Sequence, residues 1–112
     1  LVSGSGSGTN DYFGAAVTVS GTTGLVGAYG SKITRNLVIR ANQGAAYVFR
    51  GLDTATGTNT HNVRLTASDG EANDFLGYSV GLSGSLGLAG AYGDDIGANA
   101  DQGSAYLYRN LD

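Results

Sequence analysis

Apolar and polar residues alternate along two stretches of this chain. In residues 15–20 (AAVTVS) and 78–83 (YSVGLS) every second side chain faces the same way and is apolar, which is the period of a strand with one buried face. Residues 24–30 (GLVGAYG) and 87–93 (GLAGAYG) show little alternation. The absence of alternation predicts strands that are covered on both faces.

Three further runs have the composition of strands. Residues 44–50 and 103–109 are rich in aromatic and bulky residues, and alternation returns at 63–67. The chain contains 20 Gly and no Pro, and Gly adopts the positive φ of tight turns without steric cost. The pattern predicts an all-β protein of short strands and tight turns.

The predicted strands occur twice in the same order, because the chain contains an internal repeat. A shift of 63 residues superposes segment 27–30 on segment 90–93, both of which read GAYG. The match resumes at residues 43–44 and 102–103 with a shift of 59. The first copy therefore has four extra residues within segment 31–41, and we expect a loop there because loops tolerate insertions.

The two copies differ in the number of predicted strands. The first blade, residues 9–67, has four strands, and the second blade, residues 68–112, lacks its last one. In the register of the repeat Val2 corresponds to Leu65, so residues 1–3 are predicted to form a shortened fourth strand. We interpret residues 1–112 as a single module of two repeats, in which residues 1–3 of one chain are exchanged to complete the second blade of another.

Small sheets repeated at this spacing predict a β-propeller, whose blades bury their faces against each other. Two blades cannot close a ring of about 4 to 8 blades. The expected fold is therefore two four-stranded antiparallel blades that are completed by other blades or chains. The alternative is an eight-stranded β-sandwich that is complete by itself.

Composition excludes several classes of function. The formal net charge is −3, with one Lys and five Arg, so no basic face is available for nucleic acid. No apolar run approaches the ~20 residues of a membrane span, so no membrane insertion is expected. No motif places a Ser/His/Asp set, a phosphate loop or two facing carboxylates, and we predict that the protein is not an enzyme.

Three motifs recur in order in both copies. The first copy reads NDYFGAAVTVSG, GLVGAYG and NQGAAYVFR, and the second reads NDFLGYSVGLSG, GLAGAYG and DQGSAYLYR. These motifs resemble FG-GAP repeats, the blades of the integrin α-subunit propeller and of many bacterial extracellular proteins, and LTASDGEANDFLGYSV is most similar to the bacterial branch. The resemblance implies an extracellular or cell-surface propeller for adhesion or ligand binding, without catalysis.

The resemblance does not extend to the calcium loop of integrin-type repeats. Such repeats place Asp residues between the Phe-Gly strand and the Gly-Ala strand, whereas residues 20–24 (SGTTG) and 83–87 (SGSLG) contain no carboxylate. The Pro of the family's Gly-Ala-Pro motif is also replaced, by Tyr29 and Tyr92. We therefore expect no cofactor, and calcium stays open only for other acidic segments.

Two acidic segments contain candidate metal ligands. Calcium takes several carboxylate or amide oxygens from a flexible loop, but neither segment has the full ligand pattern. The preferred interpretation is that these residues form turns by bonding nearby backbone N–H groups. We expect the same turn role for Asp11 and Asp74, which recur in both copies. The candidate ligands are Asp69, Glu71, Asn73, Asp94, Asp95, Asn99 and Asp101.

Tyr29 and Tyr92 are the candidate ligand-binding residues, because both follow Gly-Ala at a strand end. Tyr at such a place can contact a sugar or a protein, or can pack between blades. We expect the partners to be copies of the chain or further blades, with a protein or glycan ligand. The functional hypothesis is a non-catalytic, self-associating binding module, and the alternative is a carbohydrate-binding lectin assisted by calcium.

Overall fold

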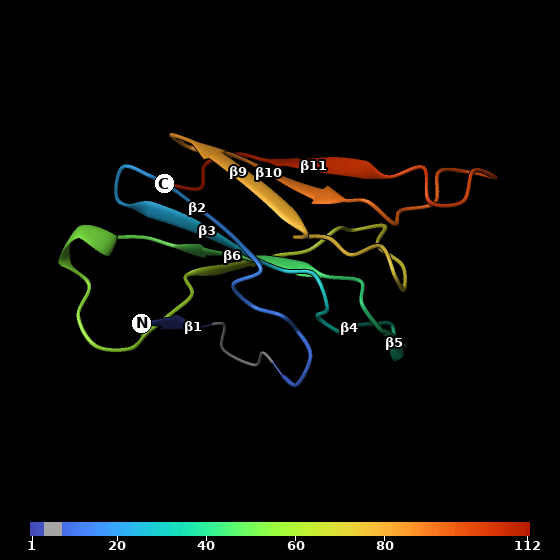
Figure 1. Cartoon of the computed structure of the whole chain (residues 1–112), viewed down its shortest axis with the longest axis horizontal. Helices are drawn as coiled ribbons and strands as arrows, with labels where there is room; N and C mark the ends of the chain where they lie inside the picture. The colour runs from blue at the N-terminus through green and yellow to red at the C-terminus, as the bar shows by residue number, and fades with distance from the viewer. Residues whose placement is uncertain (4–7) are drawn as a thin grey trace.

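The computed structural model describes residues 1–3 and 8–112, and this part of the chain consists mainly of β-strands and turns. Two antiparallel sheets lie face to face, one above the other in Figure 1. A 3₁₀ turn, η1 (Leu52–Thr54), is the sole helical element among the described residues. None of the helical structure in this part is long and apolar enough to span a membrane. The all-β prediction is confirmed.

The first sheet contains four strands in the order β2 (Ala16–Ser20), β3 (Thr23–Ala28), β6 (Ala45–Phe49) and β8 (Val63–Leu65). All neighbouring strands are antiparallel. Strands β2 and β3 are joined by two residues, of which Gly21 has a φ of 58°. Gly adopts this left-handed conformation without steric cost, so the hairpin can be this tight.

The second sheet contains three strands in the order β9 (Ser79–Ser83), β10 (Leu86–Ala91) and β11 (Ser104–Tyr108). Its pairing repeats that of the first sheet: Gly27 pairs with Ala46, and Gly90 pairs with Ala105 at the corresponding place. Strand β11 is at the sheet edge and has no second neighbour among the described residues. The two sheets are thus two copies of one blade pattern.

Two short strand pairs flank the sheets. Strand β1 (Val2–Ser3) runs parallel to β7 (Asn59–Thr60). Strands β4 (Ile33–Arg35) and β5 (Val38–Arg40) form an antiparallel hairpin. This hairpin occupies the segment where the first repeat has its four extra residues, so the insertion has a regular structure of its own.

The β4–β5 hairpin ties the two repeats together. The Arg35 guanidinium donates to the carbonyl oxygens of Ser68 at 2.6 Å and Gly70 at 3.0 Å. Arg40 Nε lies 3.1 Å from the carboxylate of Glu71. Because the Glu71 carboxylate of this ion pair is largely exposed, we expect the pair to add little to stability. The bonds from Arg35 to backbone carbonyls fix the position of the loop before β9.

One apolar core joins the two sheets. Strand β9 lies against β2 and β3, and a fully buried Leu in such a core contributes about 1.5–3 kcal/mol. At the crossing point a Cβ on Gly27 would collide with the carbonyl of Gly77, so the backbones can approach this closely only because both residues are Gly. The buried core residues are Leu25, Ala46, Val48, Leu65, Ala67, Leu76, Ala89, Ala91 and Leu111.

The opposite face of the first sheet is covered by other parts of the chain. Val2, Phe13 and Leu52 pack there against a second group of buried residues that includes Tyr47 and Phe49. As a result, all six residues of β3 are buried, as the sequence predicts. Val2 packs against this second group of buried residues, and its counterpart in the repeat, Leu65, belongs to the core between the sheets.

For β10 the prediction of two covered faces is wrong. Leu86 and Leu88 are 46% and 50% exposed, because the first sheet covers the inner face of β10 and nothing in the described part of the chain covers its outer face. The alternative of an eight-stranded sandwich also differs from the structure. The described residues form packed sheets of four and three strands, and the second sheet leaves one face open.

Candidate functional site

The outer face of the β9–β10–β11 sheet is apolar and exposed. Leu88 and Leu107 are 50% and 51% exposed. Around Leu88 the surface is hollowed in two places, with volumes of about 350 Å³ and 250 Å³. The residues that line these hollows are Ser79, Val80, Gly81, Leu82, Ser83, Leu86, Gly87, Leu88, Gly90, Ala105 and Leu107.

The corresponding face of the first sheet is completely buried. Leu25 and Val48 take the places that Leu88 and Leu107 have in the second repeat, and both are 0% exposed. They are covered by the second sheet. The same residue positions are thus buried in one repeat and exposed in the next.

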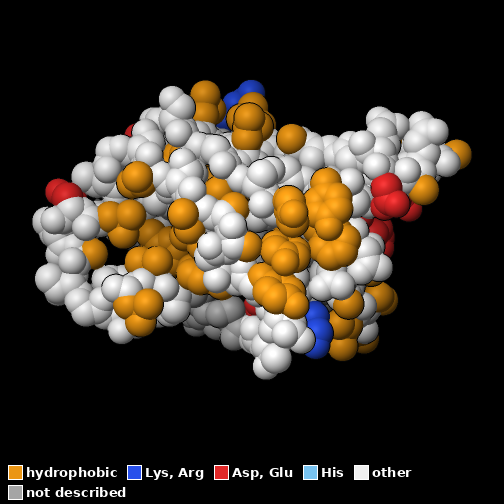
Figure 2. All heavy atoms as spheres, viewed as in Figure 1, with side chains coloured by type: hydrophobic (Ala, Val, Ile, Leu, Met, Phe, Trp, Pro, Cys, Tyr) orange, Lys and Arg blue, Asp and Glu red, His pale blue; other side chains and the backbone are white. Residues whose placement is uncertain are grey.

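A row of five aromatic rings crosses both repeats. Within each repeat two rings stack, Tyr12 on Tyr29 at 5.0 Å and Phe75 on Tyr92 at 5.1 Å. Tyr78 links the two pairs, with centroid distances of 5.1 Å to Tyr29 and 4.6 Å to Tyr92. Figure 2 shows a group of hydrophobic side chains in this region, where β9 begins and β10 ends.

The two candidate Tyr residues differ in their surroundings. Tyr29 packs between the repeats, against Tyr12, Phe75 and Tyr78, and is partly buried. Tyr92 is 53% exposed. Tyr29 therefore packs between the blades. Ligand binding by Tyr29 or Tyr92 stays a prediction.

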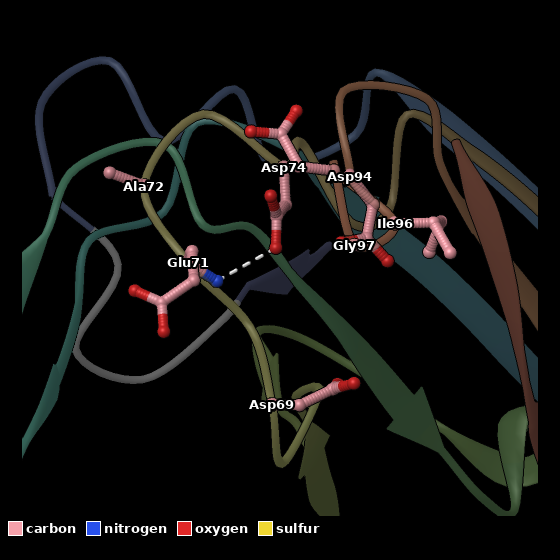
Figure 3. A pocket seen from close by; sticks show the side chains of 8 residues that line it. Asp69, Glu71, Ala72, Asp74, Asp94, Ile96 and Gly97 are labelled. Atoms are coloured by element: carbon pink, nitrogen blue, oxygen red, sulfur yellow. Dashed lines mark hydrogen bonds between the residues drawn. The ribbon is translucent and has the colours of Figure 1, made fainter. Parts of the chain in front are cut away.

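An acidic hollow of about 310 Å³ lies between the loop that precedes β9 and the loop that follows β10. It brings together four of the predicted ligands, Asp69, Glu71, Asp94 and Asp95, with Asp74 as a fifth carboxylate. In Figure 3 the Glu71 side chain points away from Asp74 while its backbone N–H bonds to the Asp74 carboxylate. Asn73, Asn99 and Asp101 do not line the hollow.

The carboxylates of the hollow have hydrogen-bond partners within the protein. The Tyr106 hydroxyl lies 2.8 Å from Asp69 Oδ1 and 3.1 Å from Asp94 Oδ2, and it can donate to one of them at a time. The Ser104 hydroxyl also donates to Asp94 Oδ2. Asp69 and Asp94 are far apart in sequence, so Tyr106 bridges the two loops, which are also joined by the Gly93 N–H donating to the Asp74 carbonyl at 3.1 Å.

Asp11 and Asp74 have the turn role that the sequence predicts. The Asp11 carboxylate accepts the backbone N–H of Gly8 at 2.6 Å, and the Asp74 carboxylate accepts that of Glu71 at 2.7 Å. Burial raises the pKa of Asp74; the hydrogen bond from Glu71 opposes this shift, and the nearby carboxylates, Asp94 above all, add to it.

Burial also changes the titration of two Tyr residues near the hollow. It raises the pKa of Tyr106, and the hydrogen bond to Asp69 adds to the shift. Burial raises the pKa of Tyr108 to about 12, with a further contribution from the charge of Asp69. The Tyr108 hydroxyl donates to the Thr66 carbonyl at 3.2 Å. Both hydroxyls thus bond groups within the protein.

In the described part of the chain, no group of three or more His, Cys, Asp or Glu side chains is arranged to hold a metal ion. The remaining candidates take part in local contacts. Asn42 donates to Asn73 at 3.1 Å and Asn99 donates to Gln102 at 3.0 Å. The backbone N–H of Asp101 donates to Asp95 at 2.7 Å. Metal binding by these residues stays an untested alternative to the turn role.

The first repeat has a hollow at the same place with a different charge. It is lined by Gly8, Thr9, Asp11 and Lys32, which correspond to Glu71, Ala72, Asp74 and Asp95 in the second repeat. The acidic character is therefore particular to the second repeat. The fold supplies the hollow in both repeats, and the residues that differ between the copies set its charge.

Two sheets with the same strand order, packed so that one face of the first meets the opposite face of the second, have the arrangement of consecutive blades of a β-propeller. The sequence profile of the FG-GAP repeat family matches residues 2–49 and 60–108. The chain belongs to the FG-GAP repeat family, which is generally non-enzymatic and forms propeller-type protein-interaction modules. Neither a curated protein nor a solved structure matches the chain significantly.

Proposed function

We propose that this chain is a non-catalytic binding module of an extracellular or cell-surface protein, and that it joins further FG-GAP blades into a propeller. One observation carries the proposal: Leu88 and Leu107 are half exposed, whereas their counterparts Leu25 and Val48 are fully buried by the following blade. An additional blade on the outer face of the second sheet would bury Leu88 and Leu107 in the same way.

The proposal is tested with two copies of the chain joined in tandem. Asp112 corresponds to Asp53 and Leu1 to Arg64 in the repeat, so a linker with the sequence of residues 54–63 keeps the natural spacing. Leu88→Asp in the first copy would place a charge inside the new interface, at a cost of several kcal/mol. The same substitution in the second copy would remain at the surface and serves as the matched control.

We expect the tandem with Leu88→Asp in its first copy to melt at a clearly lower temperature than the tandem with the substitution in its second copy. Equal melting temperatures for the two variants would show that the outer face does not take a blade. A tandem with a Gly/Ser linker of the same length tests whether the sequence 54–63 contributes its own strand.

Adhesion and the extracellular location are part of the same proposal. They are supported by the occurrence of FG-GAP repeats in surface proteins. Antibody labelling of intact cells that produce the protein, compared with permeabilised cells, measures the location directly. Label that appears only after permeabilisation would contradict it.

The aromatic row favours carbohydrate binding as a second candidate function. Tyr12, Tyr78 and Tyr92 are each about half exposed and lie in one row. Aromatic faces of this kind bind apolar faces of sugar rings. A glycan array with wild-type protein and with Tyr92→Ala tests this function, and a second array with a chelator tests the calcium requirement. A signal that survives Tyr92→Ala would exclude the row as the binding site.

A further inference from the structure

The contacts between the two blades of this chain are specific, and each can be followed to its counterpart in the repeat. Three backbone hydrogen bonds join the loop before β6 in the first blade to the start of the second blade. Asn73 N–H donates to the Ala41 carbonyl at 2.9 Å. Phe75 N–H and Leu76 N–H donate to the carbonyls of Asn42 and Gln43, both at 3.0 Å. For the first blade, this acceptor loop is segment 41–43, which follows the β4–β5 hairpin.

The same donors and acceptors are present near the two ends of the chain. The carbonyls of Ala100, Asp101 and Gln102 correspond to the acceptors, and the N–H groups of residues 10, 12 and 13 correspond to the donors. Within the described part of the chain, none of these six groups has a backbone hydrogen bond.

The unpaired groups already have the backbone conformation of the paired ones. Asp101 has a φ of 54°, close to the 56° of Asn42. Asn10 and Asn73 both have a φ of 67°. Because these are unusual left-handed values for residues other than Gly, the agreement shows that both ends are preformed for the contact that the interior positions make.

The apolar faces match in the same way. Val80 and Leu82 of β9 pack on the core between the blades. Their counterparts in β2 are Val17 and Val19, which are 68% and 64% exposed. The chain thus exposes both halves of its own interblade contact: the β2 face at the first blade, and the Leu88 face at the second.

Two further polar contacts between the blades have open counterparts. Gly84 N–H donates to Ser20 Oγ at 3.0 Å, and Arg50 Nε donates to the Leu111 carbonyl at 2.8 Å. The counterparts of the two side chains are Ser83 and Arg109. Both are exposed, and in the described part of the chain neither side chain has a hydrogen bond or an ion pair.

We infer that a second copy of this chain docks head-to-tail on the outer face of the β9–β10–β11 sheet through its β2 face, and that its β1 becomes the fourth strand beside β11. This inference rests on the proposed function, because it names the blade that fills the open face. In the first sheet Leu65 of β8 pairs with Ala46 of β6. The same register pairs Val2 of the incoming copy with Ala105 of β11.

The geometry of the contact determines the type of assembly. The two faces differ, so the contact is heterologous and repeats from copy to copy, giving a closed ring or an open filament. Propellers close with about 4 to 8 blades, and each copy brings two blades. A closed ring therefore contains about two to four copies.

The test uses two variants of the whole chain that each lose one face. Leu88→Asp places a charge on the outer face of the second sheet, and Val17→Asp places one on the β2 face. Both positions are at least half exposed, so the single chains are expected to fold, which circular dichroism checks. The control is Leu37→Asp in the β4–β5 hairpin, because Leu37 is 98% exposed and belongs to neither face.

Sedimentation equilibrium measures the mass of each protein. We expect wild type and Leu37→Asp to form a discrete multimer of the 11.3 kDa chain, and Leu88→Asp alone and Val17→Asp alone to be monomers. An equimolar mixture of these two is expected to give a dimer, because the intact β2 face of one fits the intact Leu88 face of the other. Deleting residues 1–3 is expected to lower the affinity of one copy for the next at least tenfold.

Three results would overturn the inference: a wild-type monomer at every concentration, no dimer in the mixture, or unchanged assembly without residues 1–3. If wild type is a monomer while the tandem protein shows the expected dependence on its first Leu88, the open face takes a covalently linked blade but not a second copy. The proposed function would then stand and this inference would fail. If the tandem shows no dependence either, both fail.

Discussion

Leu25 and Leu88 are the same position of the repeat in two different surroundings, and they allow a direct test of the fold. Leu25 is 0% exposed in the core between the sheets, and Leu88 is 50% exposed on the outer face. Replacing each with Ala removes the same atoms from the same kind of strand. The difference between the two effects therefore measures the cover that the second sheet provides.

The expected magnitudes follow from burial. Leu→Ala at a fully buried site costs about 2–5 kcal/mol, from lost transfer free energy and the cavity that remains. At a half-exposed site without a cavity we expect about 1 kcal/mol or less. For a domain of this size 1 kcal/mol corresponds to about 4 °C in melting temperature. Leu25→Ala is thus expected to lower the melting temperature by about 8–20 °C, and Leu88→Ala by about 4 °C or less.

Thermal or urea unfolding followed by circular dichroism measures both values. The protein must be dilute enough to remain unassembled, because a second copy on the outer face would bury Leu88 as well. Equal losses of stability for Leu25→Ala and Leu88→Ala in monomeric protein would refute the packing of the two sheets, since they would mean that both Leu residues have the same surroundings. At high concentration we expect the loss for Leu88→Ala to grow.

Three other expectations follow from the structure. Gly77→Ala should lower the free energy of unfolding by several kcal/mol, because Gly77 has a φ of 89° and the new Cβ would collide with the Ala45 carbonyl. Gly14 has a φ of 95° but open space around it, so Gly14→Ala should cost only about 1–2 kcal/mol. Urea unfolding of the two variants measures the difference. Because burial raises the pKa of Asp74, its contribution to stability is complete below pH 3.8 and is lost as the pH rises through the pKa of the folded state. Asp74→Asn should therefore flatten the curve of melting temperature against pH in that range. Tyr108 should ionise at about pH 12, and between pH 10 and 12 wild type should lose stability that Tyr108→Phe retains, as alkaline unfolding curves can show.

The strands and their repetition could be predicted from the sequence because they depend on local pattern. Alternation in residues 15–20 and 78–83 predicts the strands β2 and β9 correctly, but the apolar side chains Val17 and Val19 of β2 are exposed and not buried, because burial depends on what covers the strand. The change of shift from 63 at the GAYG segments to 59 at residues 43–44 and 102–103 located the insertion in residues 31–41. The turn role of Asp11 was also predictable, because its carboxylate bonds a backbone N–H only three residues away.

Features that depend on contacts between distant residues could not be predicted in this way. The acidic hollow brings together Asp69 and Asp94 from different loops, which Tyr106 bridges. The four extra residues form a hairpin that holds the second repeat because Arg35 reaches carbonyls more than thirty residues along the chain. The open face of β10 was missed for another reason: the residues of β10 follow the pattern of the covered strand β3, and the pattern does not show whether a second sheet is present to cover them.

The edge of the second sheet supports the proposed fourth strand independently of the apolar face. Natural proteins protect exposed edge strands with Lys, Pro or bulges, because unpaired N–H and C=O groups otherwise recruit other chains. Strand β11 (SAYLY) has no charged residue and no Pro, and no strand covers its outer edge among the described residues. In the first sheet the same edge is covered by β8. An edge without protection is compatible with a soluble protein when a strand of defined register occupies it, and Val2–Ser3 has both the position in the repeat and the apolar residue that this requires.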